Sequence, residues 1–131
     1  MRILGLVLLI ALVGGALTIW LRGRSQPRVD GDLAVIQQLA NAGSDLSKPH
    51  PIEFFLYFPS EQLAQSAAAQ VRQAGFQAKV ELGAEKKNWL CLATKSLVPA
   101  HAALVAIRAQ FEELASNLGG EYDGWGTPVV Q

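Results

Sequence analysis

The chain has 131 residues, as many acidic as basic side chains, and a hydrophobic fraction of 50%. This length leaves room for one small domain, and a single cysteine excludes an internal disulfide bond. The charge is unevenly divided: residues 1–28 carry four arginines and no acid, whereas residues 29–131 carry 7 basic and 11 acidic side chains, a net 7 − 11 = −4. Phosphate backbones are bound by lysine and arginine, so an acidic domain disfavours direct nucleic-acid binding.

The first element is an apolar segment. Residues 3–21 contain no charged side chain and only Thr18 as a polar one. Such a stretch would span roughly 28 Å as a helix, about the thickness of a bilayer's hydrocarbon core. One arginine precedes it and three follow, Arg22, Arg24 and Arg28. This bias predicts a transmembrane anchor over residues 1–22, with the rest of the chain on the cytoplasmic side of the inner (plasma) membrane.

Two alternatives compete with the anchor. Gly14-Gly15-Ala16 resembles the small-residue cleavage site of a signal peptide. Apolar sequence continues past that site through Trp20 and Leu21, which favours an uncleaved anchor. A buried helix of a soluble domain is the second alternative.

The remaining chain predicts a polar linker over residues 23–31 and one domain over residues 32–131. Asp30 or Asp32 can cap a first helix that stops at Gly43. Residues 52–58 and 89–93 are nearly all apolar and predict central strands, whereas residues 76–82 alternate and predict an edge strand. Apolar stripes predict helices over residues 61–74 and from Pro99 to Leu118. With a last strand near residue 121, the order predicts an α+β fold: a ferredoxin-like βαββαβ domain with an extra N-terminal helix.

The closing stretch of residues 119–128, GGEYDGWGTP, concentrates aromatic, acidic and glycine residues. It predicts a helix stop followed by a last strand, with Trp125 and Tyr122 packing on the core. Tryptophan and tyrosine are also enriched at interface anchors. Glu121 and Asp123 are expected to face outward and to carry a contact. We therefore predict a protein-binding site made of Glu121, Tyr122, Asp123, Gly124 and Trp125.

The same residues carry a resemblance to a known family. The string from Glu121 to Thr127, EYDGWGT, and the loop from Asn41 to Asp45, NAGSD, resemble the ribonuclease E inhibitor family (RraB, regulator of ribonuclease E activity B) over roughly residues 32–128. The resemblance implies a ferredoxin-like protein that binds an endoribonuclease and lowers its activity. It therefore implies a protein partner, no enzymatic activity and no cofactor, with this chain as a membrane-anchored member.

Other chemistry finds little support in the sequence. His50 and His101 lie beside prolines or at a helix start without a second ligand at metal spacing, and are expected at the surface. Cys91, between Leu90 and Leu92, is expected to be a small buried hydrophobe. No catalytic, metal-binding or cofactor-binding residue is therefore predicted. The alternative function is a small-ligand sensor with no nuclease partner, and the sequence leaves the oligomeric state open.

Overall fold

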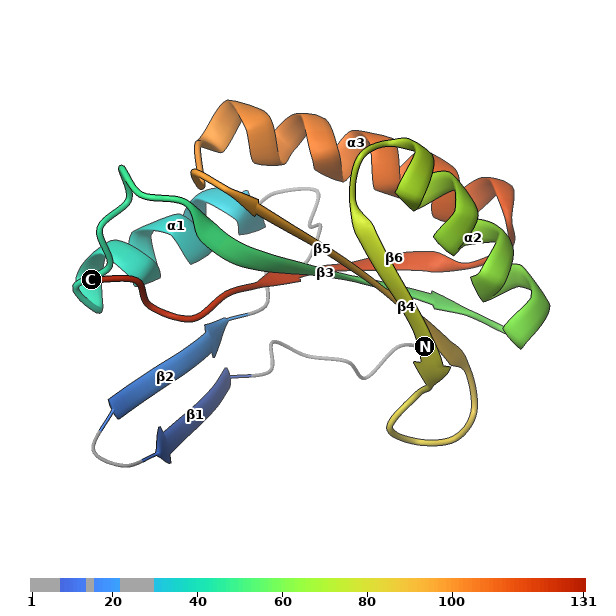
Figure 1. Ribbon diagram of the computed structural model, residues 1–131, viewed down its shortest axis with the longest axis horizontal. Coiled ribbons are helices and arrows are strands. Elements are labelled where there is room, and N and C mark those ends of the chain that lie inside the picture. Colours follow the sequence, from blue (N-terminus) through green and yellow to red (C-terminus); the bar gives the residue numbers. More distant parts are fainter. Residues whose placement is uncertain (1–7, 14–15, 22–29) are drawn as a thin grey trace.

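A computed structural model describes residues 8–13, 16–21 and 30–131, with side chains over residues 30–131 (Figure 1). The domain contains the helices α1 (Gly31–Asn41), α2 (Glu61–Gln73) and α3 (His101–Asn117). Its strands are β3 (His50–Phe58), β4 (Gln77–Leu82), β5 (Trp89–Leu97) and β6 (Glu121–Gly126). The predicted α+β class and the order βαββαβ behind an extra helix are confirmed.

The four strands form one antiparallel sheet in the order β4-β5-β3-β6. The two apolar segments are therefore its central strands and the alternating segment is an edge, as the sequence predicts. All three helices cover the same face of this sheet, which we call the inner face (Figure 1). The opposite side is the outer face.

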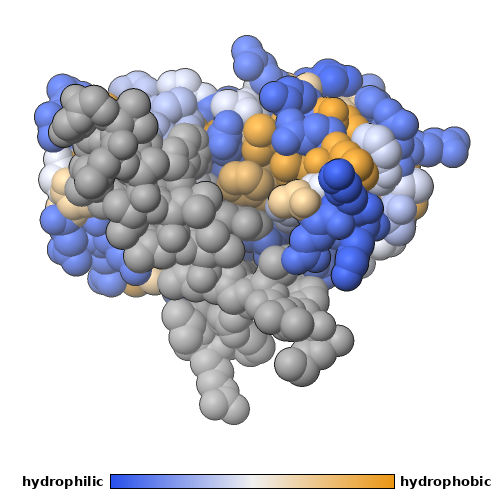
Figure 2. Space-filling view, turned by 90° about the horizontal axis from the view of Figure 1, so that it is seen from below, coloured by the Kyte–Doolittle hydropathy of each residue, from blue (hydrophilic) through white to orange (hydrophobic). Residues whose placement is uncertain are grey.

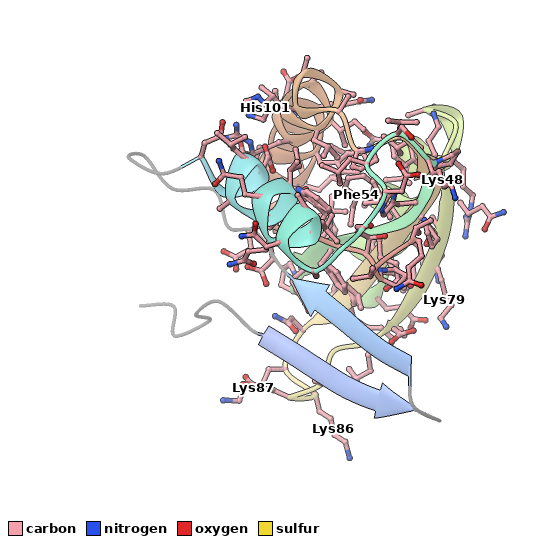
Figure 3. All side chains as sticks on the ribbon, turned by 90° about the vertical axis from the view of Figure 1, so that its left-hand side faces the viewer. Lys48, Phe54, Lys79, Lys86, Lys87 and His101 are labelled. Carbon is pink, nitrogen blue, oxygen red and sulfur yellow. The ribbon has the colours of Figure 1, made fainter. Side chains whose placement is uncertain are left out.

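Alternation along β3 decides which side chains form the core. Phe54 and Leu56 are fully buried on the inner face, whereas Phe55 and Tyr57 between and beyond them are half-buried on the outer face. Phe54 lies between sheet and helices (Figure 3), edge-on to the rings of Phe76 and Phe111, with centroids 5.5 and 5.4 Å away. Such edge-to-face pairs stabilise a core beyond the area they bury.

The helices begin and pack for identifiable reasons. Ser60 caps α2, because its side chain accepts a hydrogen bond from the backbone N–H of Leu63. Small side chains let this helix lie close to the sheet, since its buried residues are Ala64, Ala67, Ala68 and Val71. Asp30 caps α1 through the backbone N–H of Leu33. Of the two predicted caps, Asp30 is therefore the one used.

The N-terminal segment differs from its prediction. The structure pairs β1 (Leu8–Val13) with β2 (Ala16–Leu21) as antiparallel strands, with Leu8 opposite Leu21 and Val13 opposite Ala16. Among the described residues, no helix combines the length and apolar character that crossing a bilayer requires. The helix predicted over this segment is thus wrong for β1 and β2. The predicted linker, apart from Asp30 and Gly31, lies outside the described residues.

A physical reason for this difference lies in the composition. A continuous apolar run does not distinguish a helix from a strand, because neither the 3.6-residue nor the two-residue period is visible in it. The two strands are separated in the sequence by Gly14 and Gly15, and a glycine pair favours a two-residue hairpin connection.

The turn between α3 and β6 lies close to the end of β3, and this close approach generates a prediction. A Cβ atom at Gly120 would overlap the backbone oxygen of Tyr57 and the ring of Phe58, whereas one at Gly119 would meet nothing within 4 Å. We expect Gly120→Ala to cost about 2–3 kcal/mol in free energy of unfolding, because a backbone oxygen has little room to retreat. Gly119→Ala should cost about 1 kcal/mol, because Gly119 has a positive φ of 74°.

The measurement is urea unfolding of the full chain, followed by tryptophan fluorescence. Equal costs for the two substitutions would show that the close approach at Gly120 is not a constraint.

Candidate functional site

Strand β6 contains the five residues predicted to bind a protein, and a β-bulge determines where they point. Trp125 pairs with Phe54 and Tyr122 pairs with Leu56, so Asp123 and Gly124 together oppose the single residue between those partners. Gly124 has a φ of 100°, which favours glycine at a bulge. In a regular strand, residues three apart point to opposite faces. The bulge brings Tyr122 and Trp125 to the same inner face.

Trp125 is fully buried and takes part in a polar network. Its indole Nε1–H donates to Oδ1 of Asp32 at 3.0 Å, and Nε of Arg108 donates to Oδ2 of the same carboxylate at 2.7 Å. Asp32 is only 3% exposed. One buried carboxylate therefore joins α1, α3 and β6, and its charge is balanced by a guanidinium.

Tyr122 packs against the core next to this network. Its ring meets Phe111 with the centroids 5.9 Å apart, and its hydroxyl is buried without a hydrogen-bond partner among the described residues. Burial raises the pKa of this phenol well above its ordinary value, so Tyr122 stays neutral. As with Trp125, its role in the structure is to hold β6 on the core.

The two acidic residues of β6 do not behave alike. Glu121 is half-buried opposite Tyr57 on the outer face, where the sequence predicts it. Asp123 is only 3% exposed, so it is not the exposed contact residue that the sequence predicts. The bulge is not the reason, because it sets Asp123 and Gly124 together opposite the single residue between Phe54 and Leu56 and changes the face of Trp125 instead. Of the five predicted site residues, only Glu121 is not buried.

The outer face is the broad surface to which Glu121 belongs. The pairing registers place on it Glu53, Phe55 and Tyr57 of β3, Gln77, Lys79 and Glu81 of β4, and Leu90, Leu92 and Thr94 of β5. Figure 2 views the molecule from this side and shows hydrophobic residues flanked by hydrophilic ones. Apolar side chains at the centre with charged ones around them are typical of protein interfaces.

The loop that resembles the family contacts the end of the chain. The hydroxyl of Ser44 accepts a hydrogen bond from the backbone N–H of Val130 at 3.0 Å, and the backbone N–H of Asp45 donates to the carbonyl of Val130. His50 is completely buried beside them, between the Ser44 hydroxyl and the carbonyl of Lys48. The expectation of a surface histidine is therefore wrong for His50. The two stretches that carried the resemblance are thus joined through the residues following β6.

Small-molecule chemistry is weakly supported around Glu121. A pocket of about 270 Å³ beside it is lined among others by Tyr57, Lys87 and Asn88, whereas ligand sites usually measure about 300–1,000 Å³. Cys91 is buried as predicted, and burial raises the pKa of its thiol to about 11. In the part of the chain that the structure describes, no three His, Cys, Asp or Glu side chains gather as a metal site would need.

Sequence reasoning missed Asp32 and Arg108 as a pair, because 76 residues separate them. One signal was present: Arg108 lies within the apolar stripe of α3, four residues after Leu104 and three before Phe111. A charged residue at such a position requires a buried partner.

This network generates a prediction. We expect Asp32→Ala to cost about 3 kcal/mol in free energy of unfolding, because it leaves the guanidinium and the indole N–H without their acceptor. In a Trp125→Phe background, the cost should be smaller, since one of those donors is already absent. Urea unfolding of the two single variants and the double variant measures the coupling. Strictly additive costs would mean that the indole bond contributes nothing.

Comparison with known protein families matches residues 30–127 to the family described as Regulator of ribonuclease activity B. No curated protein matches the chain significantly. The family match covers most of the chain, including the whole described domain up to Thr127, so the chain belongs to this family.

Proposed function

We propose that this member of the regulator of ribonuclease activity B family regulates a ribonuclease by binding it, and catalyses no reaction itself. The observation that carries the proposal is the family match over residues 30–127. Members of this family regulate ribonuclease activity and are not nucleases. The partner that we propose is ribonuclease E, in line with the family resemblance of the closing strand.

Charge favours a protein partner over RNA. Residues 29–131 carry a net charge of −4, which repels a phosphate backbone and attracts a basic protein surface. Complementary charge speeds association and suppresses wrong partners more than it adds affinity. Regulation would then act by occupying a basic surface of the nuclease rather than by competing as an RNA-like ligand.

We place the contact on the outer face, with Glu121 as a member of it. Phe55, Tyr57 and Leu92 supply apolar area, and Glu53, Glu81 and Glu121 supply negative charge around it. In this proposal Tyr122, Asp123, Gly124 and Trp125 act indirectly, because they fix the strand that presents Glu121. The predicted five-residue site thus becomes one contact residue and four supporting residues.

Charge reversal at Glu121 tests this surface. We expect Glu121→Lys to weaken binding of the full chain to purified ribonuclease E at least tenfold, about 1.4 kcal/mol, because it places like charges together. The matched control is Glu113→Lys, an exposed glutamate on α3, on the helix-covered side of the sheet. It makes the same change in net charge and should alter the Kd less than twofold.

Binding is measured by surface plasmon resonance, and regulation by the rate at which ribonuclease E cleaves an RNA oligonucleotide. Equal losses for both variants would mean that only net charge matters. Unchanged binding by Glu121→Lys would remove Glu121 from the interface.

The location of the protein is a second proposal. We propose that the apolar segment 3–21 attaches it to the inner membrane, with the domain facing the cytoplasm where a ribonuclease acts. The support is the uncharged run of 19 residues and the arginines that follow it, Arg22, Arg24 and Arg28.

Fractionation and a fusion test this location. We expect the full chain to stay with membranes after a sodium carbonate wash, because apolar attachment survives the removal of charge contacts. A reporter that is active only outside the cytoplasm, fused after Gln131, should stay inactive. An active reporter would overturn both this orientation and the proposed partner.

A further inference from the structure

The outer face is more covered than the arrangement of the helices explains. Leu90 lies on this face, opposite Tyr57 of β3 and Glu81 of β4, and yet is only 8% exposed. Tyr57 and Phe55 beside it are half-buried. All three helices lie on the other face (Figure 1). None of the described helices therefore covers these side chains.

Glu53 gives an independent sign of the same cover. Its carboxyl group lies on the outer face, and loss of water around it raises its pKa, even though Lys79 acts in the opposite direction. A glutamate on an open sheet face would keep its water and its ordinary pKa.

The β1–β2 hairpin lies on this side of the sheet. Figures 1 and 3 both show it beyond the sheet from the helices, and β2 comes close to β6. A two-stranded hairpin is at best marginally stable alone in water, so it needs a surface to pack on. The hairpin belongs to the apolar segment of residues 3–21, which contains no charged side chain. The apolar side chains of the outer face are therefore a suitable surface for it.

The hairpin is nevertheless a poor final partner for this face. Its two strands are apolar at every position except Thr18, so packing one side on the sheet leaves an apolar side toward water. A bilayer would accept the whole segment, at a gain of roughly 25 cal/mol per Å² of apolar surface removed from water. It would not accept the open edges of a two-stranded hairpin, so transfer requires the β1–β2 pairing to be given up.

We propose that the β1–β2 hairpin is a removable cover of the outer face: it packs over the β6 side of the sheet in water, and a lipid bilayer draws it away and leaves the face open to the ribonuclease. The nature of the partner rests on the proposed function, whereas the exchange between sheet and bilayer does not. The consequence is regulation by location, because the protein binds its partner at the membrane and is self-blocked away from it.

Thiol labelling of the full chain tests the cover directly. The variant Tyr57→Cys reports on the outer face next to Glu121, and Gln65→Cys, on the exposed side of α2, is the matched control. Cys91 gives little background, because it is fully buried and its thiol has a pKa of about 11. A maleimide dye is added at submicromolar protein, with and without vesicles of phosphatidylcholine and phosphatidylglycerol.

In buffer we expect the Tyr57→Cys thiol to react at least tenfold more slowly than the Gln65→Cys thiol. Vesicles should speed the reaction at Tyr57→Cys at least fivefold and leave the control unchanged. Equal rates in buffer, or no change at Tyr57→Cys once the protein has bound the vesicles, would overturn the proposal. If Tyr57→Cys does not fold by circular dichroism, Glu121→Cys serves in the same way, since Glu121 pairs with Tyr57 across β3 and β6.

The binding assay separates this proposal from the proposed function. If the hairpin covers the outer face in buffer, ribonuclease E should bind the full chain at least tenfold more tightly when the chain is in vesicles than when it is in buffer. Labelling that responds to vesicles without any ribonuclease E binding would uphold the cover and reject the partner. Equally tight binding in buffer and in vesicles would reject the cover as a block on the partner's surface.

Discussion

The arrangement of this domain depends on the hydrogen bonds that the buried carboxylate of Asp32 accepts. It accepts hydrogen bonds from the indole of Trp125 and the guanidinium of Arg108, and so connects the first helix, the last helix and the last strand. A buried charge is tolerated only when it is paired and hydrogen-bonded. If helix α1 moved away, the Asp32 carboxylate would lose both of these hydrogen-bond donors. Because β6 is an edge strand bonded only to β3 in the sheet, this polar connection also holds it from the helix side.

The bulge in β6 determines which residues of this strand pack on the core and which one lies on the outer face. Gly124 takes the positive φ that the bulge needs, and Tyr122 and Trp125 then share the inner face. Glu121 is left on the outer face beside Tyr57. A dense group of aromatic and acidic residues thus serves mainly as a support, and Glu121 is the one of the five that is not buried. Composition typical of a binding site can arise from the demands of packing an edge strand.

The two faces of the sheet obey different physical constraints. The inner face is closed by three helices and by the aromatic cluster around Phe54, so its side chains have no alternative partner. Among the described residues, the outer face carries apolar side chains without a helix above them, and the strands β1 and β2 lie on that side (Figures 1 and 3). A surface covered by a segment that is equally suited to lipid is able to exchange its cover. The exchange that we propose would link the family's regulatory role to the apolar N-terminal segment, which the match to the family does not include.

The sequence by itself determined the α+β class, the order of the elements and the central position of β3 and β5, because a strand buried on both faces shows a continuous apolar run and a strand buried on one face shows an alternation. It also indicated that Trp125 and Cys91 would be buried. Only the tertiary structure decided the burial of Asp123, and only it placed Trp125 on the same face as Tyr122, since one extra residue in a strand reverses the alternation. Only it decided the pairing of Asp32 with Arg108 and Trp125, 76 and 93 residues away, and the burial of His50. It also paired residues 8–13 with 16–21 where the sequence predicts a helix, because a uniformly apolar run fits either form and its surroundings select between them.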